Sequence, residues 1–508
     1  MNLEEQREQE NRENRKKRRK KEQMQAFAVL AGAVVVVALI VLLLITGVNA
    51  LLKAGSKGKN KAVKETSQES VQNTENELQS GDADTAEVQQ ETDTEESSPQ
   101  EPDAQDASGV GEDTAEEEPS EELSEEEIEE QKQQILDSYV QNILDMMEVE
   151  EKVATMFLVT PQNITGVQRA KQAGSTTSAA LNTYAVGGIL YDETNMEDKD
   201  QFTLMIANTR NFSKYELLIA VNDEGGASSP FSLSGIREEE LPGQAEIATS
   251  GSVSDAYRNG INKSSLFRTL GVNLNLAPVT DVATNPRSSI AGRSYGDNVE
   301  SVVSLVKSEV KGLADQGIDS CVKYFPGVGD VTGDTKSARV TSQRTKEDLE
   351  ANECVIYKEL IEEGIPMIMV SHVSMPNIIG DNTPASLSSV IMTDILRNEL
   401  GFDGVIITDY MNKGAVTKYY KHAAAPVMAV QAGADMIAVP ADFKKAYQGL
   451  LDAVQSGEIT EERINESVKR ILCMKYKNIV EYESYGFVGA QSMEAGDATG
   501  TAEDTFIE

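Results

Sequence analysis

The chain has 508 residues and a formal net charge of −38 at pH 7. Three scattered cysteines and two histidines are too few for a disulfide framework or a zinc site, and nothing in the composition implies a metal ion or an organic cofactor. The charge is unevenly distributed, which divides the chain into a basic head, an acidic spacer and one large body.

The first 64 residues contain 14 lysines and arginines against 6 acidic residues. A basic cluster is followed by an uncharged apolar run over residues 24–52, which is long enough to cross a membrane as one helix. Because positive charge stays in the cytoplasm, we expect a basic cytoplasmic head at residues 1–23, a single transmembrane helix at 24–52 and the body outside the cell membrane. A signal peptide cleaved after residues 48–50 is the alternative, although its apolar region is ordinarily shorter. Nucleic-acid binding is not expected, because the basic cluster directly adjoins the apolar run.

Residues 53–130 form the acidic spacer. Between residues 65 and 131 the chain has 26 acidic residues and no lysine or arginine. Such a segment cannot bury enough apolar surface to offset the entropy of ordering it, and its like charges extend it. We therefore expect a disordered linker that holds the body away from the membrane.

In the body, residues 131–480, short apolar runs alternate with longer helical patterns, and an acidic tail follows at 481–508. The runs are residues 155–159, 187–191, 217–221, 272–276, 320–324, 367–371, 404–408 and 435–439. Each is too short for a helix, and most are rich in β-branched residues. Eight buried strands with intervening helices predict an α/β fold, the (β/α)₈ TIM-type barrel. A doubly wound open sheet is the alternative, disfavoured because no glycine-rich phosphate loop follows the first run.

Polar residues follow several of these runs. Asn222 follows the third, Lys323 and Tyr324 end the fifth, His372 follows the sixth and Asp409 follows the seventh. In a (β/α)₈ barrel the C-terminal ends of the strands build the site, so we expect these side chains to meet at one rim. Taken singly, each is more typical of a turn, a helix cap or a satisfied core position. Their convergence is what indicates a site for a polyhydroxylated ligand.

Four segments of the body resemble glycoside hydrolase family 3, specifically its β-N-acetylglucosaminidase branch. They are residues 150–157, 276–282, 323–329 and 404–409, within a similarity that covers most of residues 145–475. The third segment, Lys-Tyr-Phe-Pro-Gly-Val-Gly, is similar to the family's Lys-His-Phe-Pro-Gly-His-Gly motif and is the most specific of the four. The resemblance implies a retaining glycosidase that acts on β-linked N-acetylglucosaminides such as cell-wall glycans.

The resemblance also implies roles for individual residues. Asp409 matches the nucleophile that attacks the anomeric carbon, and Asp334 matches the aspartate that orients the acid/base histidine. Arg293 and Lys323 match residues that bind the sugar. Tyr324, Asn222 and His372 complete the expected substrate-binding set.

The chain departs from the family pattern at several of these positions. Lys336 stands in place of the acid/base histidine, and Tyr324 and Val328 replace the two motif histidines. Asn222 replaces an aspartate, and the arginines expected shortly after it are missing. A histidine exchanges protons near neutral pH, whereas a lysine ordinarily stays charged, and a neighbouring carboxylate such as Asp334 favours that charge.

Three functions remain open. In the first, the protein is a hydrolase in which Lys336, Asp330 or Asp334 transfers the proton. In the second, it is a non-catalytic sugar or cell-wall binding module. In the third, it is a membrane-tethered adaptor for other wall enzymes. Retention of Asp409 and Arg293 supports the first, and the joint loss of several polar positions supports the second.

Overall fold

Eight short parallel strands form one sheet in the described part of the chain, residues 124–494 of a computed structural model. They are β1 (Phe157–Val159), β2 (Gly188–Leu190), β3 (Leu218–Val221), β4 (Leu274–Asn275), β5 (Asp319–Phe325), β7 (Met367–Val370), β9 (Val405–Thr408) and β10 (Ile437–Ala438). The order is β10-β1-β2-β3-β4-β5-β7-β9, and a parallel bridge between Ile407 and Met436 links the two ends. The sheet therefore closes almost completely into a barrel, as the alternating pattern predicts, and the open-sheet alternative is wrong.

The strands form where the apolar runs predict them. Each of the eight barrel strands overlaps one predicted run. All residues of β1, β2, β3, β7 and β9 are buried. A strand covered on both faces by side chains needs such a continuous apolar sequence. The first run is shorter than predicted because Thr155 still belongs to helix α3 (Val149–Thr155).

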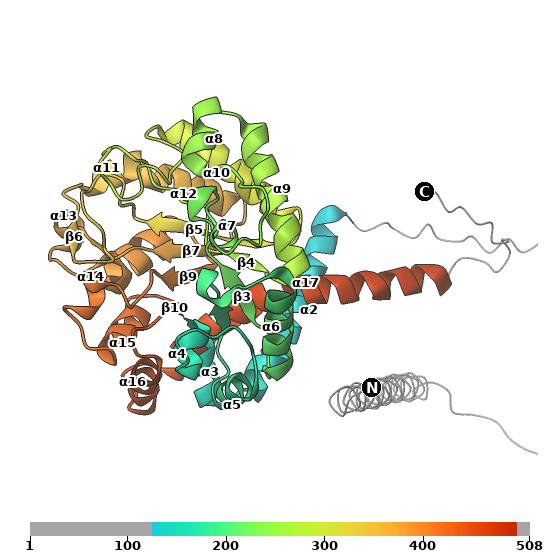
Figure 1. The fold of residues 1–508 in the computed structure, drawn as a ribbon. Helices are drawn as coiled ribbons and strands as arrows, with labels where there is room; N and C mark the ends of the chain where they lie inside the picture. The colour runs from blue at the N-terminus through green and yellow to red at the C-terminus, as the bar shows by residue number, and fades with distance from the viewer. Residues whose placement is uncertain (1–123, 495–508) are drawn as a thin grey trace, which may run out of the picture. The chain divides into compact units, whose positions relative to one another are not determined.

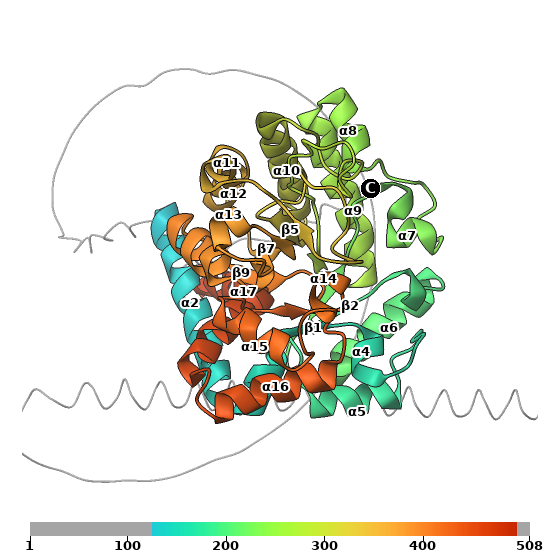
Figure 2. The ribbon, with the colours of Figure 1, turned by 90° about the vertical axis from the view of Figure 1, so that its left-hand side faces the viewer.

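Helices surround the strands (Figure 2). The longer ones are α5 (Ser175–Thr183), α6 (Lys199–Phe212), α9 (Val253–Leu270), α10 (Val299–Ala314), α12 (Glu353–Glu362), a π-helix at Val390–Glu399, α15 (Ala424–Gln431) and α16 (Phe443–Gln455). Two more, α2 (Glu125–Met146) and α17 (Glu461–Glu494), pack against each other, and α17 projects from the barrel (Figure 1).

The helical body extends past both predicted limits. Helix α2 begins inside the expected linker, because Ser124 and Glu127 form a reciprocal capping box that starts the helix there. Helix α17 continues through residue 480 to Glu494.

A second, two-stranded parallel sheet, β6 (Val340–Thr341) with β8 (Val373–Ser374), was not predicted. It connects the segments that follow β5 and β7. Two residues per strand are too few to produce a pattern that sequence analysis detects.

Three predicted segments lie outside the described residues. They are the basic head (1–23), the transmembrane helix (24–52) and the linker up to residue 123. The part of the acidic tail beyond residue 494 also lies outside them. None of the helices in residues 124–494 combines the length and apolar character needed to span a membrane.

Helices α9 and α10 approach closely at two glycines. A Cβ atom on Gly260 would lie 2.4 Å from the carbonyl oxygen of Glu309, and one on Gly312 would lie 2.3 Å from that of Tyr257. The close approach brings Lys263 within 2.5 Å of the Glu309 carboxylate, and both side chains are fully buried. Glycine is therefore needed here for packing, so that the two helices and their buried ion pair can form.

Gly260→Ala is expected to lower the free energy of unfolding by about 1–3 kcal/mol, because the added methyl group collides with the backbone of α10. Helix propensity alone predicts the opposite sign, a gain of about 1 kcal/mol. Denaturant titration distinguishes the two. Gly174→Ala is the control, because a Cβ atom there meets nothing within 4 Å. A stabilised Gly260→Ala protein would contradict the packing account.

Candidate active site

The C-terminal ends of the strands bring most of the predicted site residues together. Arg293, Tyr324, Asp334 and Asp409 line one hollow of about 260 Å³ at the barrel mouth. Lys323 lies beneath Tyr324 on β5 and is buried. These side chains come from the ends of β5 and β9 and from the loops after β4 and β5, so the barrel topology accounts for their proximity.

Asp409 directly follows β9 and is almost fully buried. Its Oδ1 accepts a hydrogen bond of 2.7 Å from the backbone N–H of Tyr410, and its Oδ2 accepts one of 2.7 Å from Nζ of Lys413. Burial raises the pKa of this carboxyl, but the positive charge of Lys413, with smaller contributions from His372 and the two hydrogen bonds, outweighs burial and holds the pKa below its usual value. Asp409 is therefore ionised, as a nucleophile must be.

Lys413 was not identified from the sequence, although it lines the same hollow. It lies four residues after Asp409, just before helix α14 (Gly414–Thr417). Its ammonium also lies 5.4 Å from the ring centroid of Tyr324 and 5.6 Å from that of Tyr410. The only available sequence signal was a cation near a candidate nucleophile, which is too common to identify a site residue.

Glu224 is the second residue that the sequence analysis missed. Both of its oxygens pair with Arg293, at 2.7 Å to Nε and 2.6 Å to Nη2, and Oε1 lies 2.6 Å from Nζ of Lys323. Burial raises the pKa of Glu224, but the charges of Lys323 and Arg293 and their hydrogen bonds lower it to about 2. One carboxylate thus neutralises both of the cations predicted to bind sugar. Its place in the segment after β3 was the signal that could have identified it.

Asn222 and Tyr324 complete this group. The amide oxygen of Asn222 accepts a hydrogen bond of 2.5 Å from Nζ of Lys323, which also donates to the carbonyl oxygen of Leu276 at 2.5 Å. The hydroxyl of Tyr324 accepts a hydrogen bond of 3.0 Å from Nη2 of Arg293. Burial lowers the pKa of Lys323 and raises that of Tyr324. Tyr324 is therefore a neutral phenol that lies between cations and does not act as a base.

His372 is fully buried, with both ring nitrogens in hydrogen bonds. Its Nε2 lies 3.0 Å from the carbonyl oxygen of Tyr410, to which it must donate, so in the neutral ring Nδ1 accepts from the hydroxyl of Ser386 at 2.6 Å. Burial lowers the pKa of His372, which favours this neutral form. The structure places His372 beneath the segment that carries Asp409 and Tyr410, outside the lining of the hollow. Its geometry suits positioning of that segment.

Asp334 and Lys336 lie on the exposed loop after β5. Asp334 Oδ1 accepts a hydrogen bond of 2.8 Å from the backbone N–H of Lys336, whose side chain does not line the hollow over Asp409. Gly414 holds this loop against the segment after Asp409, since its N–H donates to the carbonyl oxygen of Lys336 at 2.9 Å. A Cβ atom on Gly414 would lie 2.3 Å from the carbonyl oxygen of Ser337, so only glycine allows this approach.

Asp330, the other predicted proton-transfer candidate, belongs to a supporting network. Its carboxylate accepts a hydrogen bond of 2.6 Å from Ser342 and lies 3.3 Å from Arg344. Arg344 also donates to the carbonyl oxygen of Gly327 at 3.0 Å. These contacts hold the loop that follows β5, and they leave Asp330 outside the lining of the hollow.

Asp281 fixes the backbone of the same segment from below. Its two oxygens accept hydrogen bonds from the N–H groups of Tyr324, at 3.1 Å, and Val328, at 2.9 Å. Burial raises its pKa to about 7, against the effect of these two bonds. Asp281 does not line the hollow, so we assign it a structural role.

A second hollow, of about 1140 Å³, opens at the other half of the barrel mouth. It is lined by Tyr191, Asn222, Tyr410 and Asn412, among other residues at the ends of β1, β2, β3 and β10. Amides and tyrosines of this kind suit the hydroxyl groups and apolar faces of a sugar. The mouth therefore has space for a ligand longer than the hollow over Asp409 can hold.

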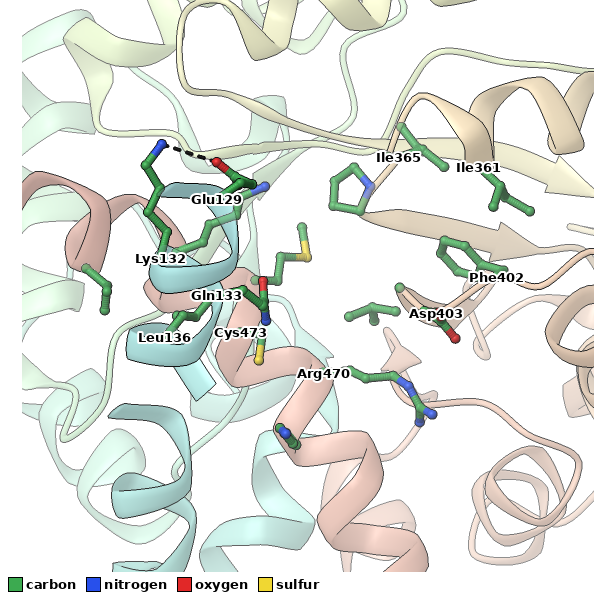
Figure 3. A pocket seen from close by; sticks show the side chains of 18 of the residues that line it. Glu129, Lys132, Gln133, Leu136, Ile361, Ile365, Phe402, Asp403, Arg470 and Cys473 are labelled. Carbon is green, nitrogen blue, oxygen red and sulfur yellow. Dashed lines mark hydrogen bonds and ion pairs between the residues drawn. The ribbon is translucent and has the colours of Figure 1, made fainter. Parts of the chain in front are cut away.

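A further hollow, of about 1570 Å³, lies at the opposite end of the barrel, among α2, α17 and the residues that precede β7 and β9 (Figure 3). Its basic side chains pair with acidic ones, for example Arg470 with Asp435 at 3.1 Å and Lys477 with Asp319 at 2.6 Å. Catalytic residues in such barrels come from the other end of the strands. We therefore assign no catalytic role to this hollow.

No cluster of three or more His, Cys, Asp or Glu side chains in the described part of the chain is arranged to hold a metal ion.

Residues 148–474 match the model of the glycosyl hydrolase family 3 N terminal domain. The beta-hexosaminidase A of Pseudoalteromonas piscicida is 28% identical over 333 residues, which are 59% of this chain and 55% of that protein. The beta-hexosaminidase of Chromobacterium violaceum is 30% identical over 270 residues, which are 51% of this chain and 73% of that protein.

Among solved structures, a glycoside hydrolase family 3 beta-N-acetylglucosaminidase from Paenibacillus sp. str. FPU-7 is similar, with a TM-score of 0.62 and 32% identity. The match covers 71% of this chain and 66% of that one. The chain thus spans little more than half the length of the first relative and about two thirds of this structure.

Glu224→Gln is expected to lower the free energy of unfolding by about 3–5 kcal/mol at pH 7, because Arg293 and Lys323 then lack their shared counter-charge. The pKa of Glu224 is lower in the folded chain, about 2, than in the unfolded chain, so its stabilisation is present above about pH 4.3 and is lost as pH falls toward 2.

Denaturant titrations over this pH range should therefore show the difference between wild type and Glu224→Gln shrinking with acidity. The exposed Glu238→Gln change is the control and should show little effect at any pH. A difference that does not change between pH 7 and pH 2 would contradict the assigned charge state of Glu224.

Proposed function

The chain belongs to glycoside hydrolase family 3, and from this premise we propose that it is a retaining glycosidase acting on β-linked N-acetylglucosaminides such as those of cell-wall glycans. The observation that carries the proposal is Asp409, a buried carboxyl with a lowered pKa at the end of β9, which lines the hollow together with Arg293 and Tyr324. The names of the relatives support the same substrate class.

In this proposal Asp409 attacks the anomeric carbon and forms a covalent glycosyl intermediate, which water then hydrolyses. Arg293, held in place by Glu224, binds sugar hydroxyl groups in the hollow. The buried Lys323 pairs with Glu224 from outside the lining of the hollow and supports this arrangement. Asn222 accepts a hydrogen bond from Lys323 and lines the neighbouring hollow, where it would contact a further part of the glycan.

Proton transfer is the weak step of this mechanism. Asp334 is an exposed carboxyl among the described residues that line the hollow over Asp409, and it is the candidate proton donor there. Lys336 lies two residues further along the same loop. A lysine at this position supplies a proton less readily than a histidine near neutral pH. We therefore expect slow turnover of natural substrates.

A non-catalytic glycan-binding module is the second candidate function. The observation that favours it is the ion pair between Lys413 and Asp409, which covers the carboxylate at 2.7 Å. A chain of this kind would bind glycan at the barrel mouth without cleaving it.

If the protein is a hydrolase, aryl N-acetylglucosaminides with acidic phenols should react far faster than natural disaccharides, because good leaving groups need little protonation. Lys336→His should raise turnover of poor leaving groups much more than that of good ones, by up to about 10²–10⁴-fold. Steady-state rates on a series of aryl glycosides with phenols of different acidity measure how strongly turnover depends on the leaving group. Asp409→Asn should abolish both activities, and Lys418→His, at an exposed lysine just after α14, is the control. Equal inertness of wild type and Lys336→His on every aryl glycoside, with glycan binding retained, would favour the binding module.

We also propose that the chain is anchored in the cell membrane by residues 24–52, with the barrel outside. The basic cluster before this apolar run and the acidic segment after it support this orientation. Protease added to intact protoplasts should then remove the barrel and leave a small membrane-embedded fragment. Complete protection of the barrel until the membrane is disrupted would contradict this topology.

A further inference from the structure

Lys413 and Asp409 form an ion pair inside the hollow that the proposed function requires a sugar to enter. The ammonium lies 2.7 Å from Oδ2 of Asp409, and Oδ1 accepts the N–H of Tyr410, so both carboxylate oxygens are engaged. The side chain of Lys413 is 16% exposed and that of Asp409 is 3% exposed, so water screens this pair only weakly. A pair of this kind reduces the reactivity of the carboxylate.

The ammonium of Lys413 lies close to two aromatic rings. It lies 5.4 Å from the ring centroid of Tyr324 and 5.6 Å from that of Tyr410, within the range of cation–π attraction. Tyr324 is the residue that replaces a histidine of the family motif. The substitution at Tyr324 and the position of Lys413 are therefore physically connected, because the tyrosine ring helps to hold the lysine over the nucleophile.

An unused hydrogen-bonding group in the same hollow points to a ligand there. The hydroxyl of Ser371, at the end of β7, is 1% exposed and has no hydrogen-bond partner among the described residues, yet Ser371 lines the hollow beside Asp409. A buried hydroxyl without a partner is costly, and a ligand hydroxyl would satisfy it. The hollow thus has a polar contact ready for a sugar, but Lys413 shares the space.

Lys413 is too close to Asp409 to act as the acid/base group. In retaining glycosidases the nucleophile and the acid/base group are about 5–5.5 Å apart, on either side of the bond that breaks. The Nζ atom of Lys413 lies 2.7 Å from Oδ2, in direct contact with the nucleophile. Its geometry is that of a group that controls the nucleophile.

We propose that Lys413 is a positioning residue that keeps Asp409 ionised and covers it, so that the ion pair must separate before a sugar is attacked. This inference rests on the proposed function. In the first step an oxygen of Asp409 bonds to the anomeric carbon, and the bond from that carbon to the leaving group breaks, with the electron pair departing on the leaving group. Lys413 slows this step by withdrawing charge from the attacking oxygen and by occupying the approach.

The test measures formation of the covalent intermediate alone. A 5-fluoro N-acetylglucosaminyl fluoride has a leaving group that needs little protonation, so its rate of attachment to Asp409, followed by intact-protein mass, reports nucleophilic attack. The full-length chain in detergent is compared with Lys413→Met and Lys413→Gln, which remove the charge, and with Lys413→Arg, which keeps it. Lys418→Met, at an exposed lysine just after the same short helix, is the control.

Above neutral pH, Lys413→Met and Lys413→Gln should be labelled at least about tenfold faster than wild type, because a charge-assisted hydrogen bond no longer has to break. Lys413→Arg and Lys418→Met should behave as wild type. Loss of the cation also removes the main influence that lowers the pKa of Asp409. In the neutral variants, the pH below which the labelling rate falls should therefore be higher than in wild type. The other titratable or charged groups around Asp409 are His372 after β7, Cys321 and Tyr324 on β5, the adjacent Tyr410, and Arg293 and Asp334 in the lining of the same hollow, and these are unchanged.

Two results would overturn the inference in distinguishable ways. If wild type is labelled and both neutral variants are labelled no faster at any pH, with melting temperatures near that of wild type, Lys413 does not restrict attack, while the proposed function stands. If no variant is labelled at all, the inference and the proposed glycosidase activity both fail. Two neutral variants are used so that misfolding of one does not decide the outcome.

Discussion

A single carboxylate, Glu224, holds the barrel mouth in its observed form. It lies between Arg293 and Lys323, which come from the loop after β4 and from β5, while Glu224 itself follows β3. Without it, two cations would face each other in a poorly solvated place, at a large cost in free energy. The pKa of Glu224, lowered to about 2, reflects this balance. Two loops of the barrel and strand β5 are therefore held in one arrangement by charge, and the polar wall beside Asp409 follows from it.

The side chains around Asp409 form a connected group. Tyr324 contacts Arg293 and provides a ring for the ammonium of Lys413. Lys413 in turn pairs with Asp409. The loop that carries Asp334 and Lys336 is exposed, and Gly414 fixes it against the segment just after Lys413. Asp409 is thus held ionised, and in the proposed mechanism the groups around it restrain its attack more than they assist proton transfer.

The fold was predictable because a buried parallel barrel requires continuous apolar strands, and those runs are plain in the sequence. The positions of Asp409, Lys323 and Asn222 at the C-terminal ends of strands followed from the same rule. The partners of these residues were not predictable. Glu224 pairs with residues about 70 and 100 positions away, as its contacts to Arg293 and Lys323 require, and such pairing depends on loop geometry. Lys413 resembled any other surface lysine in the sequence, and only its place between two rings identifies it.

In the proposed function, Asp409 attacks the anomeric carbon directly. The most direct test is the stereochemistry of the first product formed from an aryl β-N-acetylglucosaminide, followed by proton NMR before the sugar mutarotates. A covalent intermediate on Asp409 requires two successive inversions, so the account predicts that the β-anomer appears first. Initial appearance of the α-anomer would contradict attack by Asp409, because it would mean that water displaces the leaving group in a single step.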